Sequence, residues 1–335
     1  MRFFILSIFI FLVSLAHGQR DSVRSELLSR EASLLVAMGN YHEAIVLLDS
    51  AVLLDSANAR AYANRSSAWD GLGITDEALK DVNTAISLEP DNPDLFYNRA
   101  LIYKNAFNYN ATVRDLKKAI EIDPKHLVSI NKLAYYYFQV KQDIDSTRKV
   151  IEDYYRQGTS KNRMDADLIG LYGYLYMQEQ QYDDALIEFD LALTIDSTLP
   201  EVIYNKGICY DNLGLFQNSV KAYTRVIEID SNNPDYYYNR AIAHSKLRDF
   251  KSAIDDYDRE IELKGPTARS LNNRGRCYMI LNEFEPAFND YMRALELEPD
   301  RPLTLLNLGL LYIRNDQREN GCEIHRKSGK GGAIY

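Results

Sequence analysis

The sequence contains few of the residues from which catalytic and metal sites are built. Its 335 residues include only five histidines and three cysteines, and these are scattered along the chain. No HExxH, CxxC, glycine-rich phosphate loop or nucleophile elbow is present. These absences argue against an enzyme, and we expect no catalytic residue, no metal and no cofactor.

Clusters of basic residues are also missing, and the net charge is −9. Because binding to nucleic acid needs grouped Lys and Arg side chains against the phosphates, we expect no nucleic-acid partner. The acidic balance itself is typical of a soluble chain.

Long apolar runs are absent except at the N-terminus. Arg2 precedes the apolar run from Phe3 to Leu15, and small residues follow at Ala16-His17-Gly18. This pattern predicts a cleavable signal peptide at residues 1–18, with a short lead at 19–24. The run is short for a membrane span. We therefore expect an exported bacterial protein of the periplasm or outer envelope, with no integral membrane domain after cleavage. An uncleaved anchor is the alternative.

What the sequence does contain is an internal repeat. Blocks of 34 residues, one of them extended to 39, begin at Ser25, Ala59, Pro93, Leu127, Ala166, Pro200, Pro234, Ala268 and Pro302. The eighth and twentieth positions of each block are small, whereas the eleventh and twenty-fourth are large. Small residues at recurring crossing points let two antiparallel helices approach closely, and large residues fill the space beside the contact. The spacing predicts two helices per block.

This pattern resembles the tetratricopeptide repeat family, and the resemblance covers residues 25–335. It implies an all-α, right-handed superhelical solenoid of nine antiparallel helix pairs, in which stability comes from the stacking of neighbouring pairs. First helices would line the concave face of such a solenoid. We expect repeats 1–4 at residues 25–164 and repeats 5–9 at 165–335, with the last repeat degenerate after Cys322.

The fourth block carries the five extra residues. It aligns Ser146 and Val150 with the twentieth and twenty-fourth positions, and it places Asp153 where five other repeats have Ala. We expect its second helix to run on through Tyr154-Tyr155. Elsewhere, Cys209 and Cys277 occupy equivalent positions two repeats apart, too distant for a disulfide, so we expect buried free thiols. Acidic pairs such as Asp255-Asp256 are interpreted as helix starts.

Asparagine recurs at the sixth position of the first helix, at Asn64, Asn98, Asn205, Asn239, Asn273 and Asn307. Asparagine is a mediocre residue inside helices, so its recurrence needs a reason. The family resemblance implies a ladder of amides that bind the main chain of a peptide in the concave groove. The alternative is that these amides bond neighbouring repeats. Tyrosines at the fifth position, Tyr97, Tyr204 and Tyr238, would widen the contact surface.

A cation follows the ladder at the seventh position, in Arg65, Arg99, Lys206, Arg240 and Arg274. These residues are candidate charge contacts to a partner. The favoured alternative is a buried stem whose charged head pairs with carboxylates of the adjacent helix.

Together, these observations predict a non-catalytic scaffold of the cell envelope that binds a protein or peptide segment in its concave groove. The alternative is a self-associating structural or assembly protein, that is, a homo-oligomer.

Overall fold

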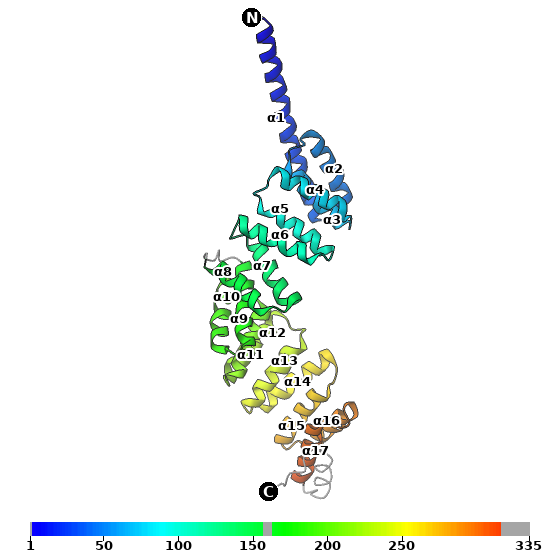
Figure 1. Cartoon of the computed structure of the whole chain (residues 1–335). Helices are drawn as coiled ribbons and strands as arrows, with labels where there is room; N and C mark the ends of the chain where they lie inside the picture. The colour runs from blue at the N-terminus through cyan, green and yellow to red at the C-terminus, as the bar shows by residue number, and fades with distance from the viewer. Residues whose placement is uncertain (1, 157–162, 316–335) are drawn as a thin grey trace. The chain divides into compact units, whose positions relative to one another are not determined.

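The computed structural model describes residues 2–156 and 163–315, although the side chains of residues 2–18, 163 and 164 are not described. These residues form seventeen α-helices and one π-helical turn, and none of them lies in a strand (Figure 1). Helices that follow one another in the chain pack as antiparallel pairs. The predicted all-α solenoid of helix pairs is therefore confirmed. The chain divides into two compact units, residues 1–160 and 161–335.

The first unit contains four helix pairs. Its elements are α1 (Arg2–Ala37), α2 (Tyr41–Leu54), α3 (Ala59–Gly71), α4 (Thr75–Leu88), α5 (Pro93–Asn105), α6 (Tyr109–Ile122), α7 (Leu127–Tyr135), the π-helical turn η1 (Tyr136–Lys141) and α8 (Ile144–Tyr155). Each pair contacts the next through its second helix, as α2 contacts α3 and α4 contacts α5. Helix α1 is continuous across residues 18 and 19, where the signal peptide is predicted to end.

The second unit repeats the same arrangement. Its elements are α9 (Arg163–Gln178), α10 (Tyr182–Ile195), α11 (Pro200–Asn212), α12 (Phe216–Ile229), α13 (Pro234–Lys246), α14 (Phe250–Lys264), α15 (Ala268–Ile280), α16 (Phe284–Leu297) and α17 (Pro302–Arg314). Helix α17 is the first helix of the ninth repeat. The degenerate end predicted after Cys322 lies outside the described residues.

The contact between paired helices depends on the small residues of the eighth position. In the sixth repeat, a Cβ atom on Gly207 would lie 2.4 Å from the ring of Tyr223, the large residue of the twenty-fourth position. Tyr223 is itself fully buried. A side chain at 207 would thus separate α11 from α12, which is the steric reason for the column of small residues.

The fourth repeat departs from the predicted register by one residue. In seven repeats the residue with positive φ that ends the first helix is the fifteenth of the block, as at Gly39 and Gly73, but in the fourth it is the sixteenth, Gln142. The extra residue is accommodated in η1, because a π-helical turn holds one more residue than an α-helical turn. Insertions of this kind shift every later residue of the hairpin.

As a result, the residues that α8 buries lie one place later than the sequence alignment placed them. Thr147, Ile151 and Tyr154 are buried, whereas Ser146 and Val150 are only half-buried. The assignment of Asp153 to the alanine position is therefore wrong, because Tyr154 occupies it and is 2% exposed. The predicted extension of the second helix through Tyr155 is confirmed.

Two further expectations concern cysteine and the membrane. Cys209 and Cys277 are buried free thiols, as predicted, and burial raises the pKa of Cys209 to about 12. Cys322 lies outside the described residues. None of the helices in the described part of the chain combines the length and the apolar character needed to cross a membrane.

Candidate functional site

The asparagine ladder links each repeat to the one before it. The side-chain amide of Asn239 donates to the Tyr204 hydroxyl at 2.7 Å, and that of Asn273 donates to the Tyr238 hydroxyl at 3.0 Å. In each bond, a sixth-position amide reaches the fifth position of the preceding repeat. Asn64 and Asn307 follow the same rule, with the Ser29 carbonyl and the Asn272 side chain as acceptors at 2.9 Å. The ladder thus has a structural role at four of its six positions.

The other two ladder residues are Asn98 on α5 and Asn205 on α11. Both are half-buried, and neither side chain hydrogen-bonds to another described residue. A half-buried amide without an internal partner keeps two donors and an acceptor for water or for a ligand. Asn98 and Asn205 are therefore the ladder residues best able to bind a peptide main chain.

The fifth-position tyrosines, next to the asparagine ladder in sequence, differ in how far their side chains are exposed. Tyr97 and Tyr204 are half-buried, whereas Tyr238 is only 8% exposed. Burial raises the pKa of all three hydroxyls above the ordinary value, so they stay neutral. The guanidinium of Arg269, the second residue of α15, lies over the Tyr238 ring at 4.4 Å from its centroid. Sequence reasoning missed this arginine.

The seventh-position arginines lie beside the ladder and form a recurring network, which we call the charged clamp. In the eighth repeat, Arg274 donates from Nε and Nη2 to both oxygens of Asp290, at 2.9 and 2.6 Å. Its Nη1 donates to Asp258 in the second helix of the preceding repeat. One side chain thus joins α15, α16 and α14.

Four repeats contain a complete clamp, in which the arginine bonds both oxygens of an aspartate sixteen residues later and a polar residue sixteen residues earlier. These triplets are Arg65 with Asp81 and Asp49, Arg99 with Asp115 and Asn83, Arg240 with Asp256 and Thr224, and Arg274 with Asp290 and Asp258. The sixth repeat has a reduced version, in which Lys206 pairs with Asp190 of the preceding repeat.

Each clamp is largely withdrawn from solvent. In the eighth repeat the side chain of Arg274 is 18% exposed and that of Asp290 is 7% exposed. Hydrogen bonds that the guanidiniums donate to the aspartates raise the pKa values of Arg65, Arg99 and Arg274, which marks these guanidiniums as already occupied. A partner carboxylate would have to displace the internal one to contact them.

The favoured interpretation of these cations, pairing with carboxylates of the adjacent helix, is confirmed for the four arginines, but sequence reasoning did not identify the carboxylates. Asp256 was interpreted as part of a helix start, but it lies in the middle of α14 and is the Arg240 partner. The available signal was a spacing, since Asp follows Arg by sixteen residues in four separate blocks. In the part of the chain that the structure covers, no three His, Cys, Asp or Glu side chains gather as metal ligands would.

Several solved structures are similar to parts of the chain. MamA residues 41 to the end, from Desulfovibrio magneticus RS-1, is 20% identical with a TM-score of 0.48 over 51% of this chain and 95% of that one. YrrB, described as a TPR protein with an unusual peptide-binding site, is 20% identical with a TM-score of 0.47 over 55% of this chain and 92% of that one. A TPR protein from Cytophaga hutchinsonii is 19% identical with a TM-score of 0.42, and the match covers 84% of this chain and 99% of that one.

A search of curated proteins finds no match. Family models, however, match along most of the chain. Four models described as tetratricopeptide repeat match residues 29–93, 93–126, 166–199, 200–233, 222–255 and 268–301. Four of these segments begin at residues 93, 166, 200 and 268, where the blocks of the sequence repeat also begin. With its repeated helix pairs, this chain belongs to the tetratricopeptide repeat family.

Proposed function

We propose that this chain is a non-catalytic scaffold of the cell envelope that binds a peptide or protein segment along its concave face. The observation that carries the proposal is the pair Asn98 and Asn205, whose side chains have no internal hydrogen-bond partner within the described residues although they are half-buried. Each amide can form two or more hydrogen bonds to a peptide main chain, and each bond contributes about 0.5–1.5 kcal/mol net.

The remaining ladder residues support this face in a second way. Asn239 and Asn273 hold the hydroxyls of Tyr204 and Tyr238 by hydrogen bonds between repeats. A ligand surface whose side chains are fixed beforehand loses less conformational entropy on binding. The envelope setting rests on the predicted signal peptide at residues 1–18.

A two-residue variant separates binding from folding. Asn98→Ala with Asn205→Ala removes only amides that lack an internal partner, whereas alanine at Asn239 or Asn273 would also remove a bond between repeats. The matched control is Asn110→Ala with Asn232→Ala, because both residues are exposed and lie outside the first helices. Each chain, from Gln19 onward, is immobilised and exposed to a native envelope extract.

We expect the unmodified chain and the control to retain the same proteins, and the ladder variant to bind them about tenfold more weakly. Helical circular dichroism and the melting temperature should be equal in all three. Equal retention by the ladder variant would exclude binding along this face.

A second candidate function, self-association, is supported by an apolar stripe on the first repeat. Val23, Leu27, Leu34 and Met38 are 61–72% exposed. The first three lie on one face of α1 at helical spacing, and Met38 directly follows the end of that helix. We propose as the alternative that this stripe pairs two copies of the chain. Light scattering over a concentration series, with Leu27→Glu and Leu34→Glu combined as the variant, tests it, since a monomer at every concentration contradicts it.

A further inference from the structure

The fourth repeat lacks the charged clamp and replaces each of its three members. Leu133 occupies the arginine position. Because η1 shifts the register of α8 by one residue, Val150 takes the place of the clamp aspartate. Lys117 of α6 stands where Asp49 or Asp258 lies in other repeats. The fourth repeat thus has a lysine where other repeats have a residue that accepts a hydrogen bond from the arginine. Two aliphatic side chains, Leu133 and Val150, stand in place of the buried arginine–aspartate pair.

A cavity of about 380 Å³ lies at this position, between α6, α7 and α8. Its lining is about half polar and half apolar, and Ile120, Ile130, Leu133 and Val150 are among the apolar side chains. Leu133 is buried and belongs to the hydrophobic core of the unit. An arginine side chain in place of Leu133 would extend into this space, as Arg274 does in the eighth repeat. The cavity therefore lies beside Leu133, which occupies the place of the clamp arginine.

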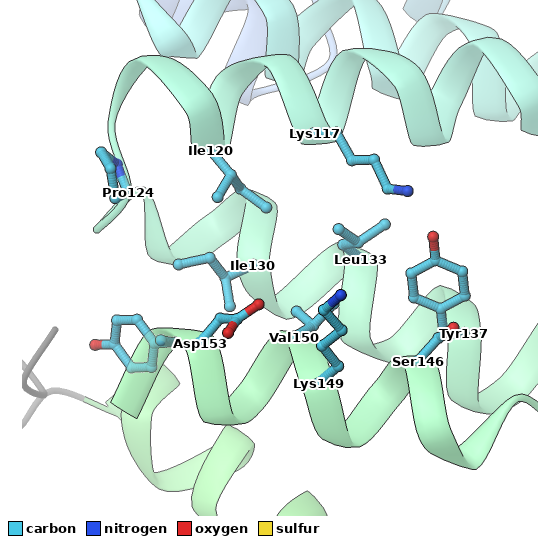
Figure 2. Close-up of a pocket in the computed structure, with 11 residues that line it drawn as sticks. Lys117, Ile120, Pro124, Ile130, Leu133, Tyr137, Ser146, Lys149, Val150 and Asp153 are labelled. Carbon is cyan, nitrogen blue, oxygen red and sulfur yellow. The ribbon is translucent and has the colours of Figure 1, made fainter. Parts of the chain in front are cut away.

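Two lysines stand at the mouth of the cavity. Figure 2 shows Lys117 and Lys149 extending from facing helices on either side of Leu133, with the Tyr137 hydroxyl beside Lys117. Neither lysine forms an ion pair or a hydrogen bond with another described residue; the Lys117 ammonium only lies over the Tyr137 ring, at 5.9 Å from its centroid. The carboxylate in the lining, Asp153, pairs with Arg156 at 2.8 Å.

Corresponding grooves in other repeats differ in chemistry rather than in size. In the eighth repeat a groove of about 440 Å³ is lined by Arg274, Asp258 and Asp290, whose charges are paired with one another. In the sixth repeat a groove of about 340 Å³ contains Lys206, which pairs with Asp190. The fourth repeat thus combines a cavity of mixed lining with two lysines that form no ion pair with another described residue, although the carboxylate of Asp153 lies in the same lining.

We propose that this cavity binds a small organic carboxylate, with its apolar body against Leu133 and Val150 and its carboxylate between Lys117 and Lys149. Small-molecule sites are typically mostly apolar cavities of about 300–1,000 Å³ with a few polar groups that fix orientation. The two ammonium groups supply the counter-charge for a single anion. This site is separate from the asparagine ladder, and its occupancy does not depend on peptide binding.

A matched ligand series tests the proposal on the full chain. Hexanoate, hexan-1-ol and hexylamine have the same apolar body and differ only in the head group, whereas acetate and inorganic phosphate carry charge without that body. By isothermal titration calorimetry we expect hexanoate to bind with a Kd of about 1 mM. Hexan-1-ol and acetate should bind at least about tenfold more weakly, and hexylamine should not bind.

Two exposed substitutions assign the binding to the cavity. Lys117→Gln with Lys149→Gln should weaken hexanoate binding at least about tenfold without a change in fold, because both side chains are exposed. The control, Lys104→Gln with Lys141→Gln, removes the same charge from exposed positions outside the cavity and should bind as the unmodified chain does.

A third variant replaces the residues that would contact the ligand. Leu133→Arg, Val150→Asp and Lys117→Asp together rebuild the clamp and should abolish hexanoate binding, with helical circular dichroism as the check on folding. The proposal is overturned if hexanoate does not bind, if acetate or phosphate binds equally well, or if the Lys117 and Lys149 variant binds as tightly as its control.

Discussion

The fourth and eighth repeats place the same helix pair in different chemical surroundings. In the eighth repeat, Arg274 joins three helices through hydrogen bonds to Asp290 and Asp258. In the fourth repeat, Leu133 and Val150 meet at the same point, and a cavity remains beside them. Both repeats still bury the residues that hold their own two helices together, such as Tyr291 in one and Ile151 in the other.

The difference shows that two sets of residues have separate tasks. The small and large columns determine how the two helices of a repeat pack, and they persist in both places. The clamp positions join the two helices of a repeat to each other and to the second helix of the preceding repeat, and they vary. The point where these three helices meet can therefore be polar or apolar without a change of fold.

Breaking one clamp should give the largest effect. Asp290→Ala leaves the guanidinium of Arg274 without its bidentate partner while its side chain is 18% exposed. We expect a loss of about 3 kcal/mol in the free energy of unfolding, because removal of one member of a buried pair is strongly destabilising and the partner that remains to Arg274, Asp258, is 45% exposed. Chemical denaturation followed by circular dichroism measures it. Val150→Ala, the corresponding change in the fourth repeat, should cost about 1 kcal/mol, and equal losses would contradict the comparison.

Placing the aliphatic residues of the fourth repeat at the clamp positions of the eighth should recover most of the stability that Asp290→Ala loses. Arg274→Leu with Asp290→Val removes both charges and replaces them with aliphatic side chains. Because apolar replacement of a whole buried pair is often close to neutral, the double variant should be about 2 kcal/mol more stable than Asp290→Ala. A double variant less stable than Asp290→Ala would show that the clamp contributes more than the packing that replaces it.

Sequence reasoning predicted the fold because the fold depends on sterics that repeat. Gly207 and Tyr223 lie in two periodic columns, and the requirement that a small residue meet a large one is visible in each block. The clamp could not be seen in the same way, because Arg274 and Asp290 lie on different helices and their pairing needs the geometry of the hairpin.

The register of the fourth repeat was the other feature that sequence reasoning could not predict. An extra residue in η1 has no sequence signature of its own, so the whole insertion was placed after the second helix. The ladder also had two interpretations that composition could not separate. The hydrogen bonds of Asn239 and Asn273 give these residues a structural role, while binding at Asn98 and Asn205 stays a prediction.

The stability of the polar contact between the seventh and eighth repeats should also depend on pH. Glu260 of α14 is 2% exposed, its Oε2 atom has no hydrogen-bond partner, and burial raises the pKa of its carboxyl. The folded chain therefore binds this proton more tightly than the unfolded chain. Ionisation of the buried Glu260 carboxyl therefore lowers the free energy of unfolding. This loss of stability is absent below the unfolded-state pKa, and it grows as pH rises through the folded-state pKa.

Replacement of Glu260 by Gln tests this dependence. The variant should be about 1 kcal/mol more stable than the unmodified chain near pH 8, and the difference should vanish near pH 4. Thermal melts at the two pH values measure it. Glu262→Gln removes an exposed carboxylate that pairs with Arg259 and should not raise stability near pH 8. A Glu260→Gln difference independent of pH would argue against a buried carboxylate.

The smallest expected effect comes from the turns that end the first helices. Gly73 has a φ of 77° in the second repeat, and Gln142 has a φ of 52° after η1 in the fourth. Because a residue with a Cβ atom is strained in this region, Gly73→Ala should lower stability by about 1 kcal/mol. Gln142→Gly should raise stability by about 0.5 kcal/mol, since relief of strain is partly offset by the greater freedom of glycine in the unfolded chain. Denaturant midpoints measure both changes. A lower midpoint for Gly73→Ala and a higher one for Gln142→Gly would show that η1 ends in the same left-handed turn as a regular repeat. A lower midpoint for both variants would mean that the Gln142 side chain stabilises the turn of the fourth repeat.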